Sequence, residues 1–204
     1  MKKYLSKGFT LVELLIVIAL LGAIALIVIA AINPIEQTNR ARDARFKADS
    51  AQLLSAIDRY YASHSKFPWE GCLGASCTTT SEDPFDFVSA EDDAVGLCGD
   101  SSCSSQGLLI TSQELKNAFL SRDWITDTTG AEDKKIYVGK ASGSSSSVYT
   151  CFVPLAKSNR DKAIEEEKVR SKSFDTNGVP AATTLCATSS VDWSTLGCYV
   201  CVPE

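Results

Sequence analysis

A single carboxylate stands at the start of a long apolar run. Gly8, Phe9 and Glu13 precede 19 residues without a charge, from Leu14 to Ile32. An ionisable side chain at the centre of a membrane helix costs about 2.5–3.5 kcal/mol, so it usually has a partner and a task. A carboxylate in an apolar phase is costly alone and tolerable when it is paired with a cation. Gly8 has no side chain, so it leaves the backbone before the apolar run conformationally permissive.

Eight cysteines are the second set of residues with chemistry. All of them lie beyond the apolar run: Cys72, Cys77, Cys98, Cys103, Cys151, Cys186, Cys198 and Cys201. An even, dense set in a domain of this size predicts disulfide bonds made in an oxidising compartment.

The spacing of the cysteines suggests some pairings and leaves others open. The Cys72–Cys77 and Cys98–Cys103 pairs suggest two local bridges, with cross-pairing as the alternative. Zinc could use the same spacing, but an exported domain favours disulfides, so we predict no metal site. The final two cysteines lie in an apparent strand rather than at a helix start, which argues against a redox motif. We expect them to tie the last segment to Cys151 or Cys186.

Composition excludes several classes of function. The chain has 204 residues and a net charge of −5, which suits one domain plus appendages and gives no general basic surface for nucleic acid. The basic residues Arg40, Arg42, Arg45 and Lys47 form the one candidate patch. We interpret them as buried between subunits or solvated, so no clear nucleic-acid site is predicted.

No catalytic residues or cofactors are predicted. The sequence has no Gly-rich phosphate loop and no nucleophile elbow. His64 is the only histidine, which makes a Ser-His or Cys-His pair hard to build. We therefore do not expect an enzyme.

The amino-terminal segment predicts a single membrane span. Lys2, Lys3 and Lys7 precede the apolar run and favour a cytoplasmic amino end, which puts the rest of the chain outside. The uncharged run reaches roughly 28 Å as a helix, close to the hydrocarbon thickness of a bilayer. It is longer than the apolar region of an ordinary signal peptide, which has about 7–15 residues.

The stretch Gly8-Phe9-Thr10-Leu11-Val12-Glu13-Leu14-Leu15 resembles the prepilin cleavage and methylation motif of type IV pilins and type II secretion pseudopilins. The resemblance covers roughly the first 30 residues. It implies that a prepilin peptidase/N-methyltransferase cuts between Gly8 and Phe9 and methylates Phe9. It also implies that Glu13 pairs with the terminal amine of a neighbouring subunit, at a pilus assembly platform.

The division that follows has four parts: a leader peptide (1–8), a transmembrane or filament-core helix (9–35), an amphipathic helix (36–66) and a Cys-rich globular domain (67–204). Gly22 and Pro34 weaken the first helix, so we expect it to bend or unwind between them. Pilins loosen such a segment when they pack into a filament, so the resemblance assigns both residues to assembly. A simple kink at the membrane surface is the alternative.

An apolar stripe follows at helical spacing. It contains Phe46, Leu53, Ile57 and Tyr60. This stripe predicts an amphipathic helix from about Glu36 to Ser63, with charged residues such as Asp43 and Asp49 facing water or neighbouring subunits.

The rest of the chain predicts an antiparallel sheet. Strand signals occur at 135–138, 148–153 and 198–202, and the first two flank a Ser-rich turn as a hairpin. The resulting fold class is α+β, with a long amino-terminal helical spine on a small antiparallel sheet with disulfide-pinned loops.

Four further segments receive local predictions. Thr111 and Glu114 form a capping-box pattern that predicts a helix over 112–122, with Leu115, Ala118 and Phe119 inward. Residues 70–107 are interpreted as a long acidic surface loop, and 161–172 as a solvated excursion. Asn177-Gly178 predicts a turn.

The predicted function is a structural subunit, a pilin, of a type IV pilus-like extracellular filament that polymerises with itself as a helical homopolymer. Before assembly it would reside in the cytoplasmic membrane. Two alternatives would assemble through the same amino-terminal helix: a minor pilin or adhesin that uses its loops for binding, and a type II secretion pseudopilin. Removal of residues 1–8 leaves 17 basic against 25 acidic side chains, a net charge of −8.

Overall fold

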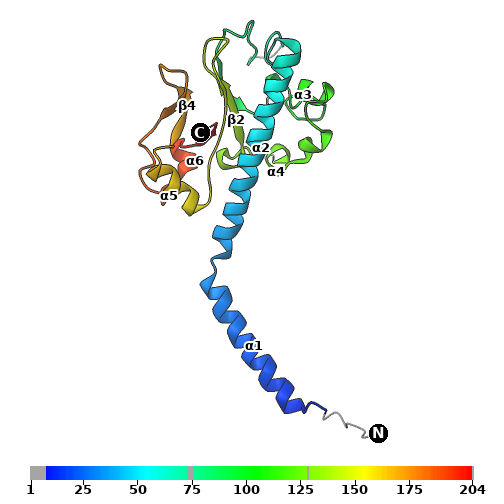
Figure 1. Ribbon diagram of the computed structural model, residues 1–204, viewed down its shortest axis with the longest axis vertical. Coiled ribbons are helices and arrows are strands. Elements are labelled where there is room, and N and C mark those ends of the chain that lie inside the picture. Colours follow the sequence, from blue (N-terminus) through cyan, green and yellow to red (C-terminus); the bar gives the residue numbers. More distant parts are fainter. Residues whose placement is uncertain (1–7, 73–75, 128, 204) are drawn as a thin grey trace, which may run out of the picture. The chain divides into compact units, whose positions relative to one another are not determined.

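The computed structural model describes residues 8–72, 76–127 and 129–203. These residues belong to two compact units, one ending at Thr38 and the other beginning at Asn39. Helices come first in the chain and antiparallel strands later, so the predicted α+β class is confirmed (Figure 1). The predicted leader covers residues 1–7, which lie outside the described residues, and Gly8.

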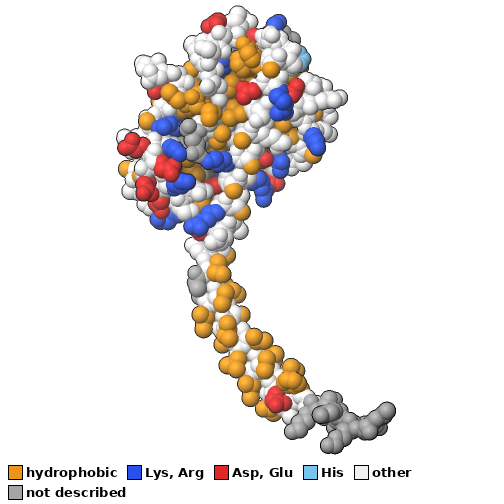
Figure 2. Space-filling model, in the orientation of Figure 1, with side chains coloured by type: hydrophobic (Ala, Val, Ile, Leu, Met, Phe, Trp, Pro, Cys, Tyr) orange, Lys and Arg blue, Asp and Glu red, His pale blue; other side chains and the backbone are white. Residues whose placement is uncertain are grey.

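Helix α1 runs from Leu11 to Ala31 without interruption. Its side chains from Leu11 to Ile29 are all exposed within the chain, and Figure 2 shows apolar side chains along the helix. Gly22 lies inside this continuous helix, and a Cβ atom added to it would meet nothing within 4 Å. The helix ends at Ile32, whose backbone is extended (φ −96°, ψ 120°).

Helix α2 begins at Pro34 and ends at His64. The Asn33 side chain accepts a hydrogen bond from the Glu36 N–H at 3.3 Å, and the Asn33 carbonyl accepts from the Gln37 N–H at 3.3 Å. Pro34 occupies the first helical position, where its missing N–H costs nothing. The helix interruption therefore falls at the end of the segment in which we expected it. Pro34 starts a second helix instead of kinking the first.

The amphipathic nature of α2 is confirmed, with one correction. The expected apolar stripe, including Phe46, Leu53 and Ile57, is buried. Asp43 and Asp49 were expected to face water or other subunits, but both are 3% exposed. They follow the spacing of the stripe, so the helix geometry turns them toward the core, where they find hydrogen-bond donors.

The main sheet has the strand order β1-β2-β3-β6, with every neighbour antiparallel. Its strands are β1 (Phe85–Ser89), β2 (Ile136–Lys140), β3 (Val148–Phe152) and β6 (Val200–Val202). Strands β2 and β3 form the predicted hairpin, with Val138 opposite Thr150. Three of these four strands were predicted. The described part of the chain adds β1, which lies inside the supposed surface loop of residues 70–107.

The 70–107 prediction is wrong because that segment contributes to the core. Besides β1 it contains the short helix η1 (Asp93–Val95). Phe85 is 1% exposed, and its ring stacks on Trp69 at a centroid distance of 4.3 Å. Acidic and polar residues dominate the composition of the segment, but its few apolar residues supply the buried contacts.

Buried Lys140 fixes the hairpin turn to this segment. Its ammonium nitrogen donates to three backbone carbonyls: Ser81 (2.7 Å), Ala141 (3.1 Å) and Gly143 (2.6 Å). Three acceptors match the three donors of an ammonium group, which is why this side chain can be fully buried.

The predicted helix over 112–122 is also wrong. Within it only the short helix η2 (Asn117–Ser121) forms, between α3 (Leu108–Thr111) and α4 (Asp123–Thr126). Gln113 has φ 63°, which a helix cannot continue through. Among the residues expected inward, Leu115 and Phe119 are buried, whereas Ala118 is exposed.

A second, smaller core lies beyond the main sheet. It is covered by α5 (Lys157–Glu165), the β4–β5 hairpin (Arg170–Phe174 and Pro180–Ala182) and α6 (Trp193–Leu196). The supposed solvated excursion over 161–172 is part of it, because Ala163 and Val169 are buried. The turn at Asn177-Gly178 is confirmed, with Gly178 at φ 74°.

All eight cysteines are paired in the structure. The pairs are Cys72–Cys77, Cys98–Cys103, Cys151–Cys201 and Cys186–Cys198. The first two close local loops. The third joins residues that face each other across β3 and β6, and the fourth lies in the second core.

A cluster of two tyrosines, one glutamate and one lysine joins the second core to the main sheet. The Tyr199 hydroxyl donates to the Glu132 carboxylate at 2.7 Å, and Lys172 lies 3.0 Å from the same oxygen. Glu132 belongs to η3 (Glu132–Lys134), and the Lys172 ammonium lies 3.9 Å from the centre of the Tyr137 ring. Burial alone pushes the pKa of Glu132 up, but hydrogen bonds from both tyrosines and Lys172 outweigh it, so that pKa lies below its usual value.

Stability should fall at alkaline pH because of these tyrosines. Burial, then the Glu132 hydrogen bond and charge, raises the pKa of Tyr137 and of Tyr199 above the usual 10.0. Above pH 10.0 the unfolded chain releases these protons while the folded chain keeps them, so the free energy of unfolding falls as pH rises. We expect Tyr199→Phe to cost about 1 kcal/mol at pH 7 and to flatten this alkaline decline. Urea unfolding at several pH values measures both, and identical alkaline slopes would contradict the assignment.

Candidate functional site

The first turn of α1 is closed by a reciprocal cap between Thr10 and Glu13. The Thr10 N–H and hydroxyl both donate to Glu13 Oε2 at 2.9 Å, and the Glu13 N–H donates to Thr10 Oγ1 at 3.2 Å. The carboxylate also lies at the positive end of the helix dipole. The sequence folds this way locally because a helix leaves its first N–H groups without partners, and these two side chains satisfy two of them.

Gly8 and Phe9 lie immediately before this cap and are open to solvent. A Cβ atom at Gly8 would meet nothing within 4 Å, and Phe9 is 82% exposed. The structure therefore brings the expected cleavage residues and Glu13 together at one helix end. Gly22 lies further along α1 and Pro34 starts α2, so neither is part of this cluster.

Sequence reasoning missed Thr10. Its signal is the pattern Thr-x-x-Glu directly before an apolar run, which is a capping box. Glu13 consequently has a task within its own chain before any partner arrives. Among the described residues its second oxygen, Oε1, makes no hydrogen bond, and a carboxylate can accept about four.

The helix behind the cap is suited to an apolar environment. Residues Leu11–Ile29 are long and apolar enough to cross a membrane, with a mean hydropathy of 3.1 over the span. The span contains one charged residue, Glu13, in its first turn. A partner or a membrane in contact with this helix would therefore meet apolar side chains and one carboxylate at the amino end.

Comparisons with known proteins agree with this amino-terminal pattern. The family model for the prokaryotic N-terminal methylation motif matches residues 4–29. A fimbrial protein of Neisseria meningitidis serogroup B is 25% identical over 183 residues, which is 87% of this chain and 93% of that protein. These similarities support a relation to type IV pilins.

A second relative matches over a shorter stretch. The type IV major pilin protein PilE1 of Neisseria gonorrhoeae is 38% identical over 64 residues, which is 31% of this chain and 38% of that protein. No solved structure matches the chain.

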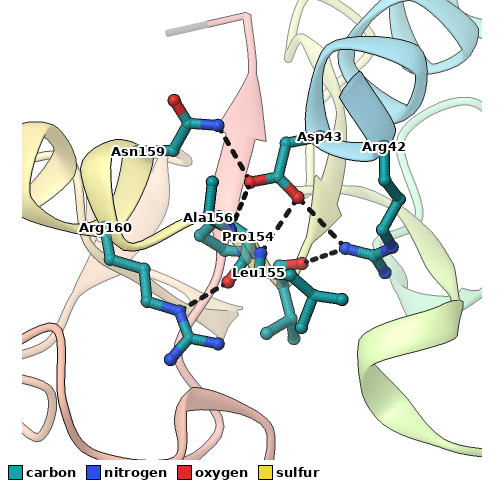
Figure 3. A network of polar contacts seen from close by, with 8 residues as sticks. Arg42, Asp43, Pro154, Leu155, Ala156, Asn159 and Arg160 are labelled. Atoms are coloured by element: carbon teal, nitrogen blue, oxygen red, sulfur yellow. Dashed lines mark hydrogen bonds and ion pairs between the residues drawn. The ribbon is translucent and has the colours of Figure 1, made fainter. Parts of the chain in front are cut away.

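The globular unit of the chain is organised around buried Asp43. Its carboxylate accepts from the Leu155 and Ala156 N–H groups and from the Asn159 side chain, each at 2.9 Å (Figure 3). Arg42 Nη1 lies 3.2 Å from the same carboxylate. Ala156 precedes the first residue of α5, which has no side-chain cap of its own, so Asp43 of α2 satisfies backbone donors at the start of α5.

Arginines hold the same segment from both sides. Arg42 Nη1 donates to the Val153 carbonyl at 3.0 Å, and Arg160 Nε donates to the Pro154 carbonyl at 2.7 Å (Figure 3). Burial lowers the pKa of Arg42, and the Asp43 charge opposes that shift. Two residues of the basic patch named in the sequence analysis make contacts within the chain. Arg42 contacts Asp43 and the Val153 carbonyl, and Arg45 forms an ion pair with Asp123 at 2.7 Å.

Asp49 is a second buried carboxylate of α2 that accepts a hydrogen bond from another segment, in this case α4. It accepts from the indole N–H of Trp124 at 3.0 Å and lies 3.4 Å from the Arg122 guanidinium. Within the described residues, no group of three or more His, Cys, Asp or Glu side chains is placed to hold a metal ion.

Replacement of Asp43 by Asn should destabilise the globular unit by about 3 kcal/mol. The amide keeps one acceptor oxygen where two are used, and it leaves partly buried Arg42 without its counter-charge. Asp58→Asn, on the exposed side of α2, is the matched control and should change stability by less than about 0.5 kcal/mol. Urea unfolding of the full chain in detergent, followed by tryptophan fluorescence, measures both. Equal effects would show that Asp43 does not organise the unit.

Proposed function

We propose that the chain is the structural subunit of a type IV pilus-like extracellular filament. The observation that carries the proposal is α1, whose apolar side chains are exposed all the way from Leu11 to Ile29. Burying one such side chain is worth about 1.5–3 kcal/mol, so a helix of this kind needs an apolar environment. A membrane supplies it before assembly, and the packed helices of other subunits supply it afterwards.

Processing precedes assembly in this proposal. A prepilin peptidase removes the leader (1–8) by cutting between Gly8 and Phe9, and Phe9 is N-methylated. The remaining parts are the membrane or filament-core helix (9–35), the amphipathic helix (36–66) and the Cys-rich globular domain (67–204). Exposure of Gly8 and Phe9 supports access for a protease.

Glu13 then pairs with the Phe9 amine of a neighbouring subunit. The cap occupies Glu13 Oε2, and Oε1 offers further acceptor sites, so the two tasks are chemically compatible. In an apolar filament core the pair offsets two charges that would be costly separately. Gly22 and Pro34 allow the helical part to adapt during packing. The break at Ile32 supports this for Pro34.

The precursor is a single-pass protein of the cytoplasmic membrane with its globular domain outside. A pilus assembly platform transfers it into a helical homopolymer. The disulfides suit this route, because such bonds form and persist outside the reducing cytoplasm. No catalytic role or cofactor is part of the proposal.

Intact-mass and amino-terminal analysis of unreduced protein sheared from cells tests the proposal. We expect abundant chains that begin at N-methyl-Phe9 and are lighter than the all-thiol mass by the eight hydrogens of four disulfides. Chains that retain Met1 and stay in membranes would overturn it. Processed chains at trace level would indicate a minor pilin, and processed chains absent from sheared filaments a pseudopilin.

Two substitutions at Glu13 separate its charge from its capping role. Glu13→Gln keeps an acceptor for the Thr10 N–H but removes the charge, whereas Glu13→Ala removes both. We expect both variants to be cleaved after Gly8 and both to lose at least about tenfold of the assembled filament, since an unpaired Phe9 amine remains in the core. Sheared-filament yield relative to total processed protein measures the effect.

Thr10→Val is the matched control for this pair. It removes the hydroxyl from the cap and leaves the Glu13 charge, so assembly should stay close to normal. If Glu13→Gln assembles normally while Thr10→Val and Glu13→Ala do not, the cap rather than the charge pair is what assembly requires.

A further inference from the structure

A basic cavity lies between α2, α5 and the ends of β3 and β6. Its volume is about 250 Å³. Four cationic side chains line it: Arg40 and Lys47 from α2, Lys162 from α5, and Lys168 from the turn before β4. Figure 2 shows Lys and Arg side chains over this part of the globular unit, with acidic side chains among them.

Two acidic side chains, Asp43 and Glu166, also line the cavity, but they do not neutralise its four cationic side chains. Asp43 is already held by Arg42 and three hydrogen-bond donors. Glu166 lies 3.7 Å from Lys162 and 2.8 Å from Lys168. All four cations make contacts inside the chain. Partly exposed ion pairs of this kind contribute little and exchange readily, so an incoming anion can replace them.

The floor of the cavity is apolar, with Phe152, Pro154 and Val200 among its lining residues. A small inorganic anion would contact only the cationic rim. An amphiphile, with a charged group joined to an apolar chain, contacts rim and floor together. The chemistry of the cavity therefore suits a phosphate group attached to a glycerol and acyl moiety better than a free phosphate.

The covalent chain keeps this cavity near the membrane in the precursor. Only seven residues separate Ile32, the last of the apolar run, from Arg40. Even fully extended, that segment spans at most about 28 Å, and as a helix about 12 Å. The headgroup layer next to the hydrocarbon core is about 5–7 Å thick. The chain thus holds Arg40 within at most about 28 Å of the end of the apolar run.

We propose that this cavity binds the phosphate of an anionic phospholipid headgroup at the outer face of the membrane before the subunit is assembled. Arg40, Lys47, Lys162 and Lys168 neutralise the phosphate, and the apolar floor receives the adjoining part of the lipid. The proposal rests on the membrane-inserted precursor of the proposed function, but its test needs neither cleavage nor filament formation. A subunit leaving the membrane must give up this lipid, so binding opposes premature release.

Native mass spectrometry of the full chain in a mild detergent tests the proposal. The protein is titrated with phosphatidylglycerol, with phosphatidylcholine and with glycerol 3-phosphate. We expect phosphatidylglycerol to be retained at about tenfold lower concentration than phosphatidylcholine, and glycerol 3-phosphate not to compete at similar concentration. Equal retention of the two lipids would overturn the proposal. Equal competition by glycerol 3-phosphate would also overturn it, because the ligand would then be the phosphate alone.

Charge-matched variants locate the site. Lys162→Gln/Lys168→Gln should weaken phosphatidylglycerol retention by about 30-fold. Lys66→Gln/Lys116→Gln removes the same charge from exposed positions that do not line the cavity and should leave retention unchanged. Lys162→Arg/Lys168→Arg keeps the charge and should keep binding, which separates a lost site from a misfolded one. Equal losses in both Gln variants would reduce the effect to net charge and refute the assignment.

Discussion

The apolar surface of α1 is the constraint on which the rest of the molecule depends, because the described residues leave the side chains of this helix exposed. Its side chains from Leu11 to Ile29 are exposed, and one carboxylate stands in its first turn. Such a surface requires a membrane or other helices around it. Three features follow along the chain: a cap that orders the first turn, an interruption at Ile32, and a compact globular unit that begins at Asn39.

Helix α2 has a different role, because it holds together segments that are distant in the sequence. Its buried face combines apolar side chains with Asp43 and Asp49, each surrounded by donors from another part of the chain. Apolar contacts alone are non-directional. A buried carboxylate is costly unless hydrogen-bond donors surround it. Asp43 and Asp49 therefore fix the positions of their donors, which are the start of α5 and the indole of Trp124.

Elements whose signal is local were predictable. The apolar run, the α2 stripe and the β2–β3 hairpin each follow from periodicity and turn residues within one short window. The first turn of α1 was also within reach, and only the role of Thr10 was overlooked. The order of the motif Gly8, Phe9 and Glu13 was enough to indicate the family.

Elements whose reason is tertiary were not predictable. Strand β1 forms because Phe85 stacks on Trp69 and pairs with β2, and neither contact is visible in a polar, Cys-rich segment. The pattern at Thr111 and Glu114 has the residues of a helix cap, yet Gln113 takes a left-handed backbone and the cap never forms. Asp43 looked like a solvated charge because its donors come from Leu155 and Ala156, more than a hundred residues later.

The sheet topology sets the order in which the strands become available along the chain. Strand β3 pairs with β2 across a short turn, but its other neighbour, β6, arrives only after the second core has been made, with Cys201 fifty residues beyond Cys151. Until then one side of β3 is an open edge, and open edges recruit strands from other chains. Closure of Cys151–Cys201 then fixes the late strand in place. The bond therefore joins the last strand in the sequence to a strand that the chain has formed fifty residues earlier.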